Sequence, residues 1–205
     1  MTDRTPTGAG SQKRKPASEQ PAWIDQHDHA DIIEADAARI VDHAVAVQGT
    51  HALRSDRRDA AVHEAGHMIL YHVEGARVRG ARIWPADNVW DGHTWASNPW
   101  EVSSDTDLAE DERQARILAA GWAGEAVACG DEMAIGASAH ELATARLIAA
   151  AAAYKRGLEP DYHASRLIAN VIAMLQERRA QLERIAELHK RRRRLDGRQL
   201  RELLA

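Results

Sequence analysis

Helical periodicity runs through most of the chain, and one short segment interrupts it. Apolar residues recur every three or four positions over long stretches, which is the spacing of helices with one buried face. Residues 76–100 differ, because Val, Ile and Trp there are interleaved with Gly, Pro and Asp. That composition is typical of two or three short strands joined by turns. The pattern predicts a mainly α (α+β) fold with one small β-sheet.

The length of 205 residues predicts one main domain preceded by a tail. Residues 1–22 are rich in Ser, Thr, Gly, Pro and Lys, and we expect them to be disordered because they offer little apolar surface to bury. We assign residues 23–54 to an N-terminal helix and linker, and residues 55–205 to the main domain. Helices are expected at 31–47, 55–73, 107–129, 138–155, 160–193 and 198–204.

Local signals refine two of these helices. Ser55 is expected to cap the helix at 55–73. Ser138, with Glu141 three residues later, has the spacing of a capping box. Gly66 lies in the middle of a helix, where it costs about 1 kcal/mol relative to Ala. We therefore expect another backbone or helix to approach Gly66 closely.

The composition limits the kind of metal site that the chain can form. Cys129 is the only cysteine, whereas there are eleven histidines. This excludes an intramolecular disulfide framework and any zinc site with two or more thiolates, so imidazoles and carboxylates would have to bind a metal. Lys and Arg total 27 against 31 Asp and Glu, a formal net charge of -4, which argues against a general nucleic-acid coat protein.

The pattern that carries chemistry is His-Glu-x-x-His at residues 63–67. His63 and His67 project from the same helix face, and two neutral imidazoles at that spacing can occupy two corners of a zinc tetrahedron. Glu64 lies beside them and can take a proton from a metal-bound water, as in metallopeptidases. The alternative is a solvated helix face with two ordinary histidines. A catalytic zinc also needs a third protein ligand, and the downstream candidates are Glu125, His140 and Glu141.

Residues 61–67 (AVHEAGH) resemble the zinc helix of the peptidase M41 family, the protease domain of membrane-bound, ATP-dependent FtsH proteases. Three further segments are similar to M41 segments in the same order. Residues 121–125 (GWAGE) resemble its Gly-Gly-Arg-Ala-Ala-Glu segment, and residues 135–145 (IGASAHELATA) its Thr-Gly-Ala-Ser-x-Asp-Leu-x-x-Ala segment. Residues 195–197 (LDG) and the Leu-Leu pair at 203–204 resemble its closing helix.

The resemblance implies two choices for the third zinc ligand. The family's ligand is the Asp of the third segment. Aligning the Leu and Ala that follow it places Glu141 there, whereas aligning the preceding Gly-Ala-Ser places His140 there. We prefer Glu141, because the helical pattern after it fits and a carboxylate preserves the charge of the site. Glu125 is expected to hold a zinc-bound histidine through a hydrogen bond, and it is the fallback third ligand.

The implied function is that of a zinc-dependent metalloendopeptidase with Zn²⁺ as cofactor and Glu64 as general base. The chain contains no Gly-x-x-x-x-Gly-Lys-Ser/Thr motif, so we expect it not to hydrolyse ATP by itself. It would act on flexible polypeptide, either alone, as a homo-oligomer or with a separate ATPase partner. The alternative is a non-catalytic M41-like binding or regulatory module that acts with a partner protein.

The β-rich segment is expected to contact the substrate. In the M41 family a short sheet follows the zinc helix, and its edge can pair with the substrate backbone. His93, Thr94 and Trp95 occupy that place here and are the predicted substrate-binding residues. The alternative is that the tryptophans of this segment serve as core and rim packing in a chain that lacks Phe.

Five consecutive cations, residues 190–194, lie near the expected end of a long helix, where cations favour the helix dipole. No aromatic residue is interleaved with them, so nucleic-acid binding is not expected. No apolar stretch approaches the about 18 residues that a membrane span needs, and the N-terminus lacks the apolar region of a secretory signal. These features predict a soluble, cytoplasmic protein.

Overall fold

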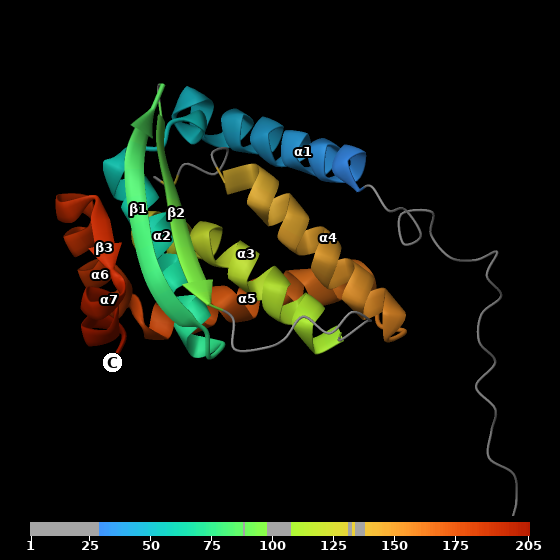
Figure 1. The fold of residues 1–205 in the computed structure, drawn as a ribbon. Helices are drawn as coiled ribbons and strands as arrows, with labels where there is room; N and C mark the ends of the chain where they lie inside the picture. The colour runs from blue at the N-terminus through green and yellow to red at the C-terminus, as the bar shows by residue number, and fades with distance from the viewer. Residues whose placement is uncertain (1–28, 88, 98–107, 131–132, 134–137) are drawn as a thin grey trace, which may run out of the picture.

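The computed structural model describes residues 29–87, 89–97, 108–130, 133 and 138–205. The described residues form seven α-helices and a small three-stranded antiparallel sheet, which confirms the predicted mainly α (α+β) class (Figure 1). The expected disordered tail, residues 1–22, lies outside the described residues. The elements are α1 (Ala30–Gln48), the 3-10 helix η2 (Gly49–Leu53), α2 (Arg57–Val73), β1 (Arg77–Ala86), β2 (Val89–Ser97), α3 (Leu108–Cys129), α4 (Ala139–Lys155), α5 (Pro160–Glu177), α6 (Arg179–Arg192), β3 (Arg194–Asp196) and α7 (Gly197–Leu204).

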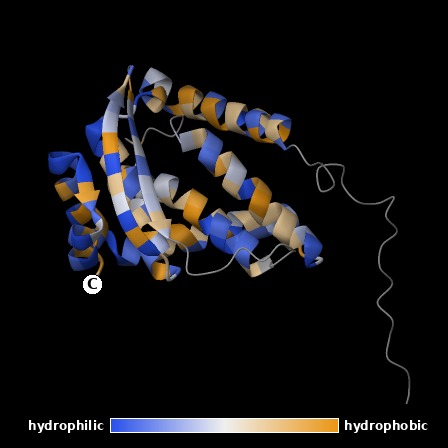
Figure 2. Ribbon diagram, viewed as in Figure 1, coloured by the Kyte–Doolittle hydropathy of each residue, from blue (hydrophilic) through white to orange (hydrophobic). Residues whose placement is uncertain are grey.

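The sheet has the strand order β2-β1-β3 and contains one strand that the sequence analysis missed. β1 and β2 pair as a hairpin, and the colours along β1 alternate between hydrophobic and hydrophilic, as expected for a strand with one buried face (Figure 2). β3 pairs with residues 80–82 of β1. We expected a helix to residue 193 followed by a turn, but Arg193 takes a left-handed conformation (φ 61°) that ends α6. The three following residues are extended, and Leu195 between its exposed neighbours is buried.

The prediction of a single long helix at 160–193 is wrong, because the structure has two helices in this segment. It is divided at Arg178 into α5 and α6, and the backbone N–H of Arg178 donates to the carbonyls of Leu175 and Gln176. The break follows from packing, because α5 packs on α3 and α4 whereas α6 packs on α2. Buried Leu175 and Leu182, on opposite sides of the break, can then both join the core. Neither Gly nor Pro marks this position in the sequence.

Helix α2 lies at the centre of the fold, with the sheet on one side and α3 and α6 on others (Figure 1). Its N-cap is Asp56 and not Ser55 as expected, because Asp56 and Asp59 form a reciprocal capping box. Ser55 instead donates its hydroxyl to the carbonyl of Trp90 at the start of β2. Ser55 therefore joins α2 to the sheet. None of the described helices is both long and apolar enough to cross a membrane.

At Gly66 the backbones of α2 and α3 approach each other closely, as expected from the sequence. A Cβ at this position would overlap the carbonyl oxygen of Ala120. On the facing helix, a Cβ at Gly124 would lie 3.1 Å from the carbonyl oxygen of Val62. The two backbones can approach this closely only because both positions lack a side chain.

Replacing Gly66 by Ala should therefore destabilise the protein by about 2 kcal/mol, since overpacking costs about 1–3 kcal/mol. Without the clash, the same change inside a helix would stabilise by about 1 kcal/mol, so the sign of the effect is the test. Urea unfolding followed by circular dichroism measures it. Ser165→Ala, at an exposed position of α5, is the control for helix propensity and should be close to neutral. A stabilised Gly66→Ala protein would contradict the described packing.

His189 is a fully buried imidazole in α6, and burial lowers its pKa to about 4. The unfolded chain, with an ordinary pKa near 6.5, therefore binds a proton between these values that the folded protein does not bind. The free energy of unfolding is therefore unaffected by His189 above about pH 6.5, and it decreases as the pH falls from 6.5 towards 4. At pH 5 the loss from this residue is about 2 kcal/mol.

His189→Leu should abolish this contribution. The difference in unfolding free energy between His189→Leu and the wild type, measured in urea, should shift by about 2 kcal/mol in favour of the variant from pH 7.5 to pH 5. His72→Leu, at an exposed position near the end of α2, is the control. Equal pH effects in the two variants would contradict the assignment.

Candidate metal centre

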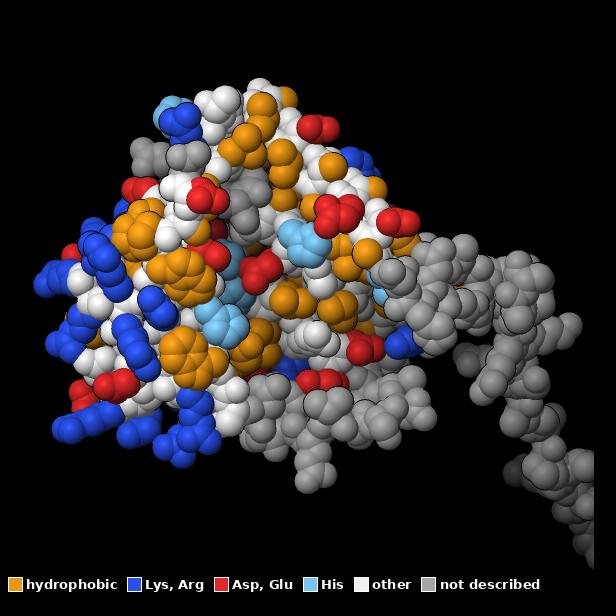
Figure 3. Space-filling view, turned by 45° about the horizontal axis from the view of Figure 1, so that its top comes forward, with side chains coloured by type: hydrophobic (Ala, Val, Ile, Leu, Met, Phe, Trp, Pro, Cys, Tyr) orange, Lys and Arg blue, Asp and Glu red, His pale blue; other side chains and the backbone are white. Residues whose placement is uncertain are grey.

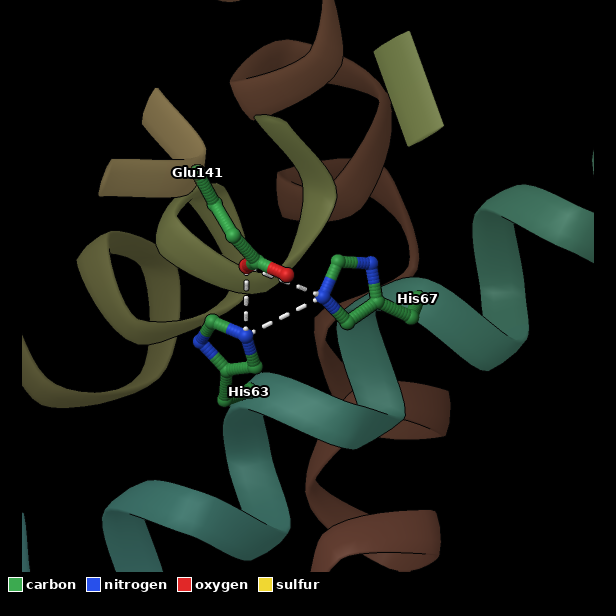
Figure 4. Close-up of side chains that lie close together, drawn as sticks. All are labelled: His63, His67 and Glu141. Carbon is green, nitrogen blue, oxygen red and sulfur yellow. Dashed lines mark hydrogen bonds and ion pairs between the residues drawn. The ribbon is translucent and has the colours of Figure 1, made fainter. Parts of the chain in front are cut away.

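Three of the predicted ligands converge on one point between α2 and α4 (Figure 4). The carboxylate Oε2 of Glu141 lies 2.9 Å from Nε2 of His63 and 3.4 Å from Nε2 of His67. The two Nε2 atoms lie 3.0 Å apart. Ligands at about 2.0–2.1 Å from a tetrahedral zinc ion are separated by about 3.3 Å, so these spacings are close to those of a coordination shell. His63, His67 and Glu141 form a group that could hold a metal ion.

The opposite nitrogen of each ring is held by an acceptor. Nδ1 of His63 lies 2.7 Å from Oε1 of Glu125, and Nδ1 of His67 lies 2.8 Å from the carbonyl oxygen of Ile117. Nδ1 must carry the proton to donate to these oxygens, so in the neutral rings Nε2 carries the lone pair. Oε2 of Glu141 faces both Nε2 atoms, and while the rings are neutral neither nitrogen can donate a hydrogen bond to it. Three lone-pair atoms without a shared proton fit a cation, and this donor set suits a metal.

The charges around the site also favour a cation. Burial lowers the pKa of His63, but its hydrogen bonds to Glu125 and Glu141 outweigh this, and the pKa is raised well above its usual value. Burial raises the pKa of Glu141, but the facing His67 and His63 outweigh it and leave the pKa far below its usual value. The carboxylates thus favour one positive charge at this point, which a second proton or a metal ion can supply.

The structure brings Glu141 to the site and not His140. The side chain of His140 is 63% exposed, and its Nδ1 lies 3.5 Å from Oε1 of Glu34 in α1. Glu125 does not join the ligand group but supports His63, as expected, and is almost fully buried. The expected capping box at Ser138 does not form, because Ser138 makes no side-chain cap hydrogen bond and Glu141 turns towards the histidines instead.

Two glycines that the sequence analysis did not assign to the site make room for its side chains. A Cβ at Gly121 in α3 would overlap the ring of His63. A Cβ at Gly92 in β2 would lie 2.5 Å from Oε1 of Glu64. A glycine inside a predicted helix is unfavourable by about 1 kcal/mol, so Gly121 was the sequence signal that could have pointed to a close approach.

Glu64 is buried beside the ligand group and is held by the sheet. The hydroxyl of Thr94 in β2 donates to Oε2 of Glu64 over 2.6 Å. Oε1 is the oxygen turned towards Gly92. A cavity of about 220 Å³ opens beside these groups. Its lining residues are Ser55, Ala60, His63, Glu64, Trp90, Asp91, Gly92, Glu125 and Glu141.

The three predicted substrate-binding residues lie on two different faces of β2. Thr94 is buried against α2 and positions Glu64. His93 and Trp95 stack on each other, with ring centroids 6.0 Å apart and planes inclined by 19°. Because successive side chains of a strand alternate, this pair lies on the opposite face of the sheet. None of the three lines the cavity.

Comparison of the sequence with models of protein families found no family that matches, and comparison with curated proteins found no match either.

Glu141→Gln should weaken metal binding by more than about 100-fold, beyond the about 10–100-fold typical for a residue that only supports a ligand. His140→Gln, one position away, should bind as the wild type does, because His140 points to α1. Elemental analysis gives the stoichiometry, with about one zinc ion per wild-type chain expected, and competition with a chromogenic chelator gives the affinity. Equal effects of the two substitutions would contradict the ligand assignment.

Proposed function

We propose that this protein is a zinc-dependent metallopeptidase that hydrolyses peptide bonds. The observation that carries the proposal is the buried carboxylate of Glu64, held by Thr94 beside the His63, His67 and Glu141 ligand group and facing a cavity. Two histidines and one glutamate with an open fourth position are the ligand set of several catalytic zinc sites. A purely structural zinc site would more often be closed by a fourth protein ligand.

His63, His67 and Glu141 would hold the ion, and nitrogen and carboxylate ligands suit zinc. A bound zinc ion supplies Lewis acidity that polarises the scissile carbonyl and lowers the pKa of water. Glu125 and the carbonyl of Ile117 keep both imidazoles in the tautomer and orientation that ligation needs.

Glu64 acts as the general base and then as the general acid. Its free oxygen, Oε1, takes one proton from the attacking water while the water oxygen bonds to the carbonyl carbon of the peptide. When the carbon–nitrogen bond breaks, Glu64 returns this proton to the leaving nitrogen, and the carboxylate is regenerated. Thr94 holds Oε2, which keeps Oε1 turned towards the cavity during both transfers.

The substrate would lie in extended form along β2. In the described sheet β2 is an edge strand, since the order is β2-β1-β3. Ser55 already occupies the backbone groups of Trp90 at this edge, so an added strand would pair beyond Trp90, next to Gly92 and Glu64, and would pass the cavity there. In this arrangement His93 and Trp95 contribute their backbone and not a pocket.

The resemblance of residues 61–67 to the zinc helix of M41 peptidases supports the same activity. It also supports the choice of Glu125 and Glu141, which occur in two further M41-like segments. We infer a peptidase domain that needs flexible polypeptide, presented by a separate ATPase partner or already unfolded, with self-association into a homo-oligomer as a further arrangement.

Glu64→Gln should reduce the cleavage of a flexible, fluorescence-quenched casein peptide by about 10²–10⁴-fold, because the general base is lost. The bound zinc should stay at the wild-type level, since Glu64 is not a ligand. Peptide cleavage and elemental analysis on the same preparation measure both quantities.

Glu183→Gln, at an exposed position of α6, is the matched control and should cleave as the wild type does. Survival of cleavage in Glu64→Gln would overturn the mechanism. A wild-type protein that holds zinc but cleaves no peptide would favour the non-catalytic binding module instead.

A further inference from the structure

The face of the sheet that points away from α2 carries arginines and aromatic rings together. We define the outer sheet face by Arg82 and Trp84 of β1, His93 and Trp95 of β2, and Arg194 of β3. These five residues are partly or fully exposed. Figure 3 shows Lys and Arg side chains gathered on one side of the molecule, with large hydrophobic side chains and a histidine among them.

The strand register places the five side chains side by side. Arg82 pairs with His93 on one side and with Arg194 on the other, and directly paired residues of neighbouring strands share a face. The guanidinium of Arg82 lies 5.8 Å from the centroid of the Trp84 ring. The stacked pair His93–Trp95 continues the surface across β2. Trp95 lies over Gly80, where a Cβ would meet its indole ring.

Two carboxylates share this face with the arginines, since Asp91 pairs with Trp84 and Asp196 pairs with Gly80. Arg82 and Arg194 lie directly opposite each other, an arrangement that is unfavourable for like charges in a sheet. Neither has an ion-pair partner among the described residues. The neighbouring carboxylate of Asp196 already accepts hydrogen bonds from the backbone N–H groups of Arg198 and Gln199. The guanidinium groups of Arg82 and Arg194 are therefore available to a partner that brings negative charge.

From the sequence alone, nucleic-acid binding is not expected, because no aromatic residue is interleaved with the cations at 190–194. In the folded chain, aromatic residues do lie beside one of these cations. Arg194 is the last residue of the basic run. Because β3 pairs with β1, Arg194 lies close to Trp84 and Trp95, which are more than 90 positions earlier in the sequence. The combination of a basic surface and stacking rings exists only in the folded chain.

We propose that the outer sheet face binds single-stranded nucleic acid. Arg82 and Arg194 contact backbone phosphates, and exposed bases stack on Trp84 and on the His93–Trp95 pair. Charge alone would serve an acidic polypeptide equally well. Flat aromatic rings beside the arginines favour bases, because each base presents a π surface for stacking.

This binding site is separate from the metal centre. Thr94, between His93 and Trp95, points to the opposite face and contacts Glu64. The proposal does not depend on peptidase activity. The Glu141→Gln protein should accordingly bind nucleic acid as the wild type does.

The test is fluorescence anisotropy with fluorescein-labelled oligothymidylate and oligouridylate of about 15 nucleotides, a length within the range that such surfaces occupy. The wild type should bind single strands more tightly than a duplex of equal length, and less tightly as salt rises. Arg82→Ala and Arg194→Ala should each weaken binding about fivefold to tenfold. Arg166→Ala, on exposed α5, removes the same charge elsewhere and should have little effect.

Trp84→Leu should also weaken binding at least about fivefold, since it removes a stacking platform while leaving the charge unchanged. This variant distinguishes base stacking from charge attraction. It does so even if Trp95 variants fold poorly because the Trp95 ring packs on Gly80. Comparison of oligothymidylate with oligouridylate tells DNA from RNA. Equal binding of polyglutamate and oligonucleotide, unaffected by Trp84→Leu, would overturn the proposal in favour of an acidic polypeptide. Absence of binding at low salt would overturn it altogether.

Discussion

The close contact between α2 and α3 is the constraint on which the site depends. Gly66 and Gly124 let the two backbones meet, and this meeting places Glu125 and the carbonyl of Ile117 against the two histidines of α2. Both acceptors come from α3, so one helix pairing orients both rings at once. A larger separation of the helices would leave two buried imidazoles without these partners, which is costly in an apolar interior. The packing of small residues and the chemistry of the histidines are therefore parts of one arrangement.

Much of the fold could be predicted because it is encoded locally. Apolar periodicity predicted most helices, and the composition of residues 76–100 predicted two or three short strands, of which the structure describes β1 and β2. The break at Arg178 and the strand β3 could not be predicted, because they depend on which surfaces α5, α6 and β1 offer to one another. A run of three extended residues has no pattern of its own. Its pairing with β1 and the burial of Leu195 distinguish it from a loop, and both arise only in the folded chain.

The candidate site divides in the same way. The spacing of His63 and His67 is a property of one helix, so the sequence alone indicates a shared face. The choice between His140 and Glu141 depended on how α4 packs against α1, α3 and α5, since adjacent helical residues point about 100° apart. The packing of Ala139 and Ala143 against Ala37 of α1 directs His140 outward and Glu141 inward. The contact of Thr94 with Glu64 could not be predicted, because the sequence alone does not show which residues of a strand face the helix.

The ligands of the site come from two helices, α2 and α4, that are far apart along the chain. An ion bound by all three would fasten His63 to Glu141 and close a loop of about 80 residues, much as a covalent cross-link does. Such a closure restricts the unfolded chain more than the folded one, so part of the binding free energy would appear as folding free energy. In a protein with a single cysteine, this ion would take the place that a disulfide has elsewhere. Chelation would then loosen the attachment of α4, and with it α1, before it affected the sheet.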